Sequence, residues 1–147
     1  MAIKNYWMLV IWLGIVGLIS LFIPKKTELV FGRERERWYF WPAFLSMVPY
    51  VIWAGWRTNS WGDTSAYKSM FAKVPSTLSK AGEYISAAEK DKGFVLIEVL
   101  FKSLISSKVE YFFLAVALFC MFALVKTYRD YSEDYWLSLF MFVAAGE

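Results

Sequence analysis

The first chemically suggestive stretch of the chain, RTNSWGDTSAY, runs from Arg57 to Tyr67 and begins where a long apolar stretch ends. Gly62, Asp63 and Thr64 form a tight turn that predicts the start of a helix. The first backbone N–H groups of a helix lack intrahelical partners, so they favour an anion. Because Arg57 lies only five residues before Gly62, its guanidinium can reach the same place, and this spacing predicts a site for a phosphate or pyrophosphate.

The side chains around this turn also suggest chemistry on a sugar. A carboxylate such as Asp63 can act as general base toward a sugar hydroxyl, and Trp61 or Tyr67 can stack on a sugar ring. A sugar carried on a lipid pyrophosphate presents that pyrophosphate at the membrane surface. The residues therefore indicate glycosyl transfer from a polyprenyl-pyrophosphate donor, with Arg57 and the helix end stabilising the leaving group.

A purely structural interpretation of the same residues stays open. Asp63 can cap the helix that follows, Arg57 can extend to the lipid headgroups, and Tyr67 can belong to an apolar helix face. Residue types alone do not choose between the two interpretations.

The composition excludes several other kinds of site. The chain has no histidine, which removes histidine acid–base chemistry, histidine metal ligands and the usual catalytic triads. Its acidic residues show no clustered ligand spacing, so neither a metal nor a cofactor is expected. The net charge of +3 comes from loops without a basic stripe interleaved with stacking residues, which argues against nucleic-acid binding. The single Cys120 excludes an internal disulfide.

Four uncharged runs are expected to form the helices that position these residues. They are residues 6–23, 38–56, 111–125 and 135–145. A membrane-spanning helix needs roughly 17–25 apolar residues. We therefore expect an all-α, multi-pass integral membrane protein, a single membrane domain with three full transmembrane helices and the start of a fourth. The expected spans are about 6–23, 38–56, 109–125 and 135–147. The first is interpreted as a retained anchor rather than a signal peptide. Two prolines predict a kink in the second.

The loops predict the orientation of these spans. Residues 24–37 and 126–134 are short and basic, which is typical of cytoplasmic loops. The amino terminus and the loop 57–110 are then outside. The alternating run RERER at 33–37 is interpreted as a solvated loop that sets the topology, with phosphate binding by one of its arginines as the alternative.

The outer loop 57–110 is expected to be helical. One helix follows Thr64, with an apolar face that includes Phe71. A second starts near Ser76. A third begins at Phe94, and its apolar stripe consists of Phe94, Ile97, Phe101, Leu104 and Ile105, with Glu98 and Lys102 as a charged pair on the other side. This third helix is too short to span, so we expect an interfacial or re-entrant helix against bilayer lipid.

Three stretches carry a family resemblance, and they follow two apolar spans. They are RTNSWGDTSAYKSMF, then DKGFVLIEVLFKSLI, which opens an amphipathic helix, then VKTYRDYSEDYWLSLFMF, a basic turn followed by another span. From about Trp38 onward the chain resembles the N-terminal part of the EpsG family. These are bacterial multi-pass membrane proteins of exopolysaccharide and capsule loci, related in type to Wzy-like polymerases.

The resemblance implies polymerisation or transfer of sugar units carried on undecaprenyl pyrophosphate, at the outer face of the bacterial inner membrane. Its implied partners are membrane lipid, the lipid-linked saccharide and other polysaccharide-assembly proteins. Asp63 is the expected general base. The expected substrate-binding residues are Arg57, Trp61, Gly62, Thr64, Tyr67, Asp91 and Gly93.

Length is the main departure from the family pattern. Such proteins are more than twice as long, so we expect this chain to be truncated relative to them, and whether it is an enzyme is left open. The alternative is a non-catalytic small membrane subunit or fragment that binds lipid-linked sugar or a partner protein. A transferase should be sensitive to changes at Arg57 and Asp63, whereas an interaction module should be sensitive along Phe94, Ile97 and Phe101.

Overall fold

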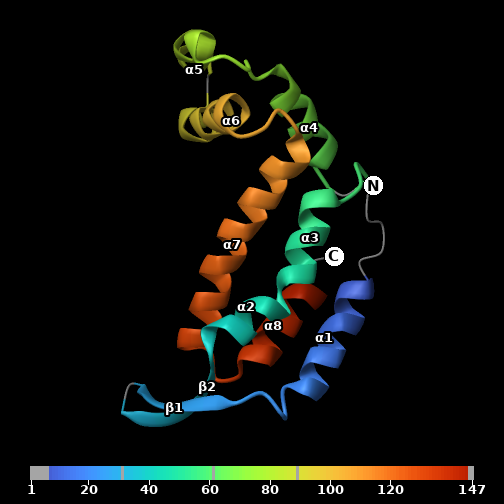
Figure 1. Ribbon diagram of the computed structural model, residues 1–147, viewed down its shortest axis with the longest axis vertical. Helices are drawn as coiled ribbons and strands as arrows, with labels where there is room; N and C mark the ends of the chain where they lie inside the picture. The colour runs from blue at the N-terminus through green and yellow to red at the C-terminus, as the bar shows by residue number, and fades with distance from the viewer. Residues whose placement is uncertain (1–6, 31, 61, 89, 146–147) are drawn as a thin grey trace. The chain divides into compact units, whose positions relative to one another are not determined.

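The computed structural model describes residues 7–30, 32–60, 62–88 and 90–145 and is mostly helical (Figure 1). The elements in chain order are α1 (Trp7–Ile19), β1 (Lys25–Val30), β2 (Arg33–Trp38), α2 (Phe40–Ser46), α3 (Val48–Trp56), α4 (Thr64–Lys73), the 3-10 turn η1 (Leu78–Lys80), α5 (Ala81–Ala87), α6 (Lys92–Leu104), α7 (Val109–Tyr131) and α8 (Tyr135–Ala144). They form two compact units. The loop unit comprises residues 54–116, and the hairpin unit comprises residues 7–53 together with 117–145.

In the hairpin unit, α1 and α8 pack against each other through an aromatic side chain. The Trp136 indole N–H donates to the Leu13 carbonyl oxygen at 2.8 Å. A Cβ added at Gly17 would lie only 2.5 Å from the Trp136 ring, so this close approach requires glycine. Leu13 on α1 and Leu139 and Val143 on α8 are buried. The fourth apolar run is therefore a helix docked on the first.

The second apolar run is not one continuous helix. It divides at Met47 into α2 and α3, which have seven and nine residues. Pro42 and Pro49 each lie in the first turn of their helix, where the missing N–H is not needed. The predicted kink is therefore present as a break. The Tyr135 hydroxyl, which donates to the Ala43 carbonyl oxygen at 2.6 Å, fixes α2 against the start of α8.

Residues 25–38, expected to be largely a solvated loop, form an antiparallel β-hairpin, so the all-α expectation needs this correction. In the RERER run, Arg35 and Arg37 have largely covered side chains, whereas Glu34 and Glu36 are exposed. This is the two-residue period of a strand. Gly32 has φ of +78°, a turn conformation that glycine adopts without strain.

The hairpin is tied to the end of α7 by a network of charges. Arg37 donates to the Glu28 carboxylate at 2.9 Å and to the Asp130 carbonyl oxygen. Arg129 donates to the Trp38 carbonyl oxygen at 2.7 Å and pairs with the Asp130 carboxylate. The bond from Arg37, followed by that from Lys26, lowers the pKa of Glu28. The two segments predicted to lie on one side of the membrane, 24–37 and 126–134, thus meet at one end of this unit.

One helix of the described residues, α7, is long and apolar enough to cross a membrane. It has 23 residues and extends six residues beyond the predicted span. The apolar helices α1 and α8 have 13 and 10 residues and are shorter than the spans expected from the uncharged runs. The structure thus provides one clear spanning candidate, and the multi-pass arrangement stays a prediction.

Candidate functional site

An aromatic cluster centred on Phe112 holds the helices of the loop unit together. The Phe71 ring of α4 stacks on Phe112 with ring centroids 5.1 Å apart. Phe94 and Phe101, both on α6, approach the same ring edge-on at 5.9 and 5.4 Å. Edge-on and stacked aromatic pairs contribute beyond their apolar burial. This cluster fixes the two helices that directly follow the candidate carboxylates.

The charged pair predicted for the side of α6 opposite the apolar stripe faces inward. Glu98 is only 2% exposed. The Lys102 ammonium donates to the carbonyl oxygens of Phe71, Ala72 and Val74 at 2.8, 3.0 and 2.7 Å. It therefore satisfies the free carbonyl groups at the C-terminal end of α4.

The apolar stripe predicted for the same helix is exposed over much of its length. Ile97, Leu104 and Ile105 are 55%, 67% and 71% exposed. The stripe divides because Phe94 and Phe101 turn toward Phe112, while the other three residues point away from the protein interior. Helix α6 thus presents an apolar outer face and uses its charged residues for packing.

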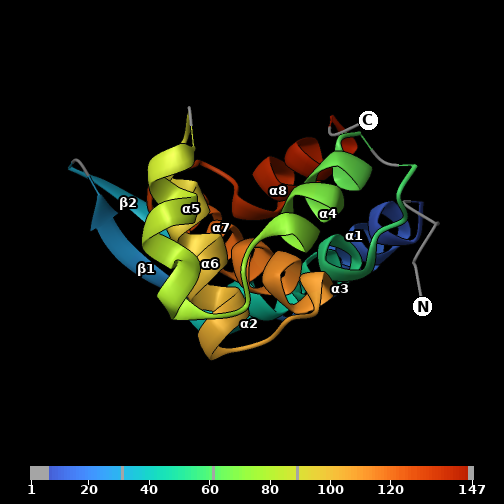
Figure 2. The same cartoon turned by 90° about the horizontal axis from the view of Figure 1, so that it is seen from above.

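Asp63, Tyr67 and Asp91, three of the predicted site residues, line one open hollow of about 930 Å³. Asp63 and Tyr67 come from the start of α4, and Asp91 lies directly before α6. Helix α5 contacts α6 (Figure 2). It supplies Tyr84 to the wall. The two separate motifs of the sequence are therefore brought together around the same space.

Neither aspartate is used as a helix cap. Asp63 and Asp91 occupy the N-cap positions of α4 and α6, and neither side chain accepts a capping hydrogen bond. Asp134, by contrast, caps α8 by accepting from the Leu137 amide at 3.0 Å. Within the described part of the chain, Asp63 and Asp91 also form no ion pair. Both carboxylates are thus available to a ligand in the hollow.

The backbone at Asp91 is held in an uncommon conformation. Its φ of +53° lies in the left-handed region, where among the described residues other than glycine it stands alone. Aspartate tolerates this region better than most residues, at a cost of about 1–2 kcal/mol.

Aromatic rings and one ammonium group complete the wall of the hollow. Tyr67 is 41% exposed and lies edge-on to Phe94, with ring centroids 6.5 Å apart. Tyr84 and Lys90 also line the space. Two free carboxylates can accept hydrogen bonds from hydroxyl groups or take up a proton, while tyrosine rings can cover an apolar sugar face.

The remaining predicted site residues do not line this hollow. The Arg57 guanidinium lies over the Phe113 ring at 5.5 Å, and its buried Nε has no hydrogen-bond partner. Thr64, the first residue of α4, is fully buried. Gly62, with φ of +45°, shapes the turn, and Gly93 lies exposed in the first turn of α6. Trp61 lies outside the described residues.

Tyr84 and Lys90, which bring polar groups to the hollow, are not among the site residues predicted from the sequence. Lys90 directly precedes Asp91, and its place beside that motif is the signal that could have identified it. Tyr84 had no comparable signal, because its position depends on the packing of α5 against α6.

The comparison with protein families identifies the chain. The model of the EpsG family matches residues 37–146, which is most of the chain, so the protein belongs to the EpsG family. This membership supports a membrane protein of exopolysaccharide biosynthesis. No curated protein and no solved structure matches the chain.

Proposed function

We propose that this member of the EpsG family binds a sugar carried on a polyprenyl pyrophosphate and takes part in its transfer to a growing polysaccharide. The observation that carries the proposal is the convergence of Asp63 and Asp91, two carboxylates without partners in the described structure, on one hollow with tyrosine walls. Sugar hydroxyls are the ligands such a wall suits, since carboxylates accept their hydrogen bonds and aromatic rings cover their C–H faces.

In the transfer step, a hydroxyl oxygen of the acceptor sugar attacks the anomeric carbon of the donor sugar. Asp63 takes the hydroxyl proton as general base. The bond between the anomeric carbon and the pyrophosphate oxygen breaks, and the electron pair leaves with the polyprenyl pyrophosphate. Asp91 hydrogen-bonds the donor sugar and orients it. A positioned base of this kind contributes about 10²–10⁴-fold to the rate.

The experiment is polymer synthesis in a host that depends on this protein for its polysaccharide. We expect Asp63→Asn to abolish polymer while the protein still inserts in the membrane, and Asp91→Asn to reduce it strongly. Glu34→Gln is the matched control, because Glu34 is an exposed carboxylate on β2 in the other unit and should leave polymer unchanged. Wild-type polymer levels in both aspartate variants would refute the proposal.

The proposal includes the membrane arrangement expected from the sequence. The protein is a multi-pass protein of the bacterial inner membrane, with its amino terminus and residues 57–110 outside. Residues 24–37 and 126–134 are in the cytoplasm, and α6 lies against the outer leaflet. The exposed apolar side chains of α6 and its position four residues before α7 support the last point.

Single cysteines test this arrangement. In a Cys120→Ala background, Ser76→Cys should react with a membrane-impermeant maleimide in intact cells, and Glu34→Cys should react only after lysis. The reverse pattern would contradict the proposed orientation.

The second candidate function is a non-catalytic subunit that docks a partner protein. The exposed apolar side chains of α6 favour it. Phe94 and Phe101 are unsuitable probes because they contact Phe112 and support the fold. Ile97→Ser is the clean test, since Ile97 is 55% exposed. A docking subunit should lose function with Ile97→Ser and tolerate Asp63→Asn, and a transferase should show the opposite sensitivity.

A further inference from the structure

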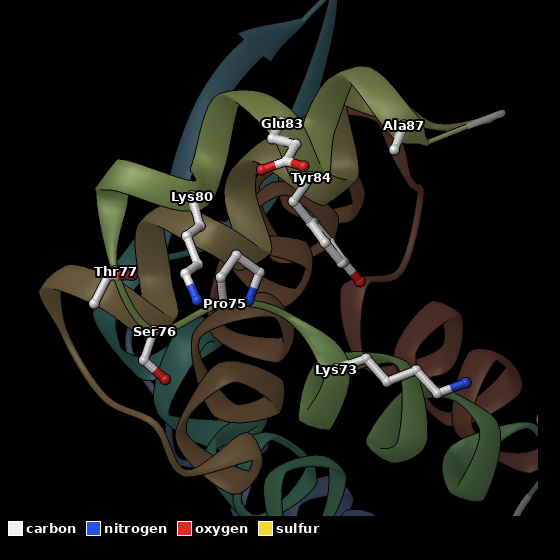
Figure 3. Close-up of a pocket in the computed structure, with 8 residues that line it drawn as sticks. All are labelled: Lys73, Pro75, Ser76, Thr77, Lys80, Glu83, Tyr84 and Ala87. Atoms are coloured by element: carbon white, nitrogen blue, oxygen red, sulfur yellow. The ribbon is translucent and has the colours of Figure 1, made fainter.

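A second hollow adjoins the proposed sugar site in the loop unit. It measures about 520 Å³ and lies between the end of α4, the segment that leads into η1, and α5 (Figure 3). The two hollows share Tyr84 and Ala87 in their walls. A ligand with two chemically different parts could therefore occupy both at once.

The charge of the second hollow is opposite to that of the first. It is lined by Lys73 and Lys80, with Glu83 as its one carboxylate, which gives a net charge of +1. The sugar hollow is lined by Asp63, Asp91 and one lysine, which gives a net charge of −1. An anion is thus favoured on one side of Tyr84 and disfavoured on the other.

The polar groups of the second hollow are not used by the fold. In the described parts of the loop unit, neither lysine ammonium has an ion-pair or hydrogen-bond partner, and the hydroxyl groups of Ser76 and Thr77 have none either. Figure 3 shows Lys80 extending toward Pro75, and Tyr84 extending from α5 toward the base of the Lys73 side chain, whose ammonium group is directed away from Lys80 in this view. Two free ammonium groups and neighbouring hydroxyl groups are the donors that phosphate oxygens need.

Arg57, which the sequence suggested as the phosphate clamp, lines neither hollow. Its guanidinium lies over Phe113 instead. The anionic part of a lipid-linked sugar therefore requires other cations, and the hollow that adjoins the sugar hollow supplies Lys73 and Lys80.

We propose that the hollow lined by Lys73, Lys80, Ser76 and Thr77 is the diphosphate subsite of this protein, joined at Tyr84 to the sugar hollow. The inference rests on the proposed function for the identity of the attached sugar, but diphosphate binding is measurable without it. In the transfer step, the two ammonium groups stabilise the negative charge that develops on the leaving diphosphate.

The test is binding to the full chain in detergent micelles, measured by calorimetry with two probes, inorganic pyrophosphate and farnesyl pyrophosphate. We expect the double variant Lys73→Gln/Lys80→Gln to weaken both dissociation constants by roughly 100-fold, about tenfold for each charge-assisted contact, with each single variant intermediate. Glu83→Gln should tighten binding because it removes the one negative charge of the wall. Lys92→Gln, at the exposed start of α6, is the matched control and should bind as wild type.

Three results would overturn the subsite. The first is unchanged affinity for both probes in the double variant while the protein keeps its wild-type circular dichroism. The second is equal loss of affinity in Lys92→Gln, which indicates general attraction of anions. The third is an affinity for phosphatidylglycerol vesicles that equals the affinity for pyrophosphate and depends on the two lysines in the same way. That result would make the hollow a lipid headgroup site.

Failure of the proposed function has a different signature. If Asp63→Asn makes normal polymer, the sugar chemistry is wrong, and the diphosphate subsite is still decided by the lysine variants. If Asp63→Asn loses polymer and keeps wild-type affinity for pyrophosphate, both proposals are supported, because the two hollows then act on different parts of one ligand.

Discussion

The contact of Lys102 with α4 gives the sharpest prediction about the loop unit. Replacing Lys102 by methionine keeps a side chain of similar length and removes the ammonium group. Three carbonyl oxygens at the end of α4, those of Phe71, Ala72 and Val74, then lose their common donor. Because the Lys102 ammonium also lies over the Phe71 ring at 5.2 Å, the aromatic cluster loses a cation–π contact as well.

The expected loss can be worked from these contacts. A hydrogen bond to a charged group contributes about 1.5–3 kcal/mol, but the three bonds share one half-buried ammonium and do not add fully. We therefore expect Lys102→Met to lower the free energy of opening of α4 and α6 by about 2–4 kcal/mol. This corresponds to amide exchange that is faster by roughly 30- to 1000-fold.

Glu98 makes the prediction more specific. Burial raises the pKa of its carboxyl group, and the charge of Lys102 opposes that rise. Since the folded pKa lies above the unfolded value of 4.5, stability is greatest below that value and falls as the pH rises through the folded pKa. Glu98→Gln should therefore stabilise the unit at neutral pH, and Lys102→Met should cost less in the Glu98→Gln background than in wild type.

The assay is hydrogen–deuterium exchange in micelles, read by mass spectrometry on peptides from α4 and α6, with peptides from α1 in the other unit as internal reference. Lys92→Met is the matched control, because Lys92 is exposed at the start of α6. Exchange in Lys102→Met within threefold of wild type would refute the reasoning, as would an equal cost in both Glu98 backgrounds.

Two further predictions concern the hairpin unit. The lowered pKa of Glu28 means that its stabilisation is present above the unfolded value of 4.5 and is lost as the pH falls through the folded pKa. The protection of the β1 and β2 amides, measured relative to their intrinsic exchange rates, should therefore fall on acidification. The pH dependence should flatten in Glu28→Gln, and an unchanged profile would contradict the role of the network. Gly17→Val should separate α1 from α8, because its Cβ would lie 2.5 Å from the Trp136 ring, with an expected cost of about 1–3 kcal/mol. Thermal unfolding followed by tryptophan fluorescence measures this cost, and Gly14→Val, at an open position of the same helix, is the control whose equal destabilisation would argue against the contact.

The local pattern of the chain predicted several elements correctly. The helix after Thr64, the helix near Phe94 and the break in the second apolar run follow from apolar spacing and from two prolines. The hairpin at 25–38 was missed because charged residues were interpreted by their charge alone. The alternation in RERER carried the strand period, and it was the available signal.

The candidate site was predictable only in part for a different reason. Asp63 and Asp91 stand out as the residues that open helices, which is a local property. The two residues line one hollow because α4 and α6 both contact Phe112. These contacts join residues that are far apart in the chain. The inward direction of Glu98 and Lys102 likewise depends on the carbonyl groups at the end of α4.

The sequence by itself indicated the class of this protein, because its long uncharged runs predict membrane helices, and its motifs resemble those of the EpsG family, whose model matches residues 37–146. Only the tertiary structure decided which charges are free and which are used in packing. The sequence pattern gives only the positions of the charges along each helix. Their partners depend on the groups that the other helices present. This holds for the bond of Lys102 to α4, for Arg57 over Phe113, and for the free carboxylates of Asp63 and Asp91.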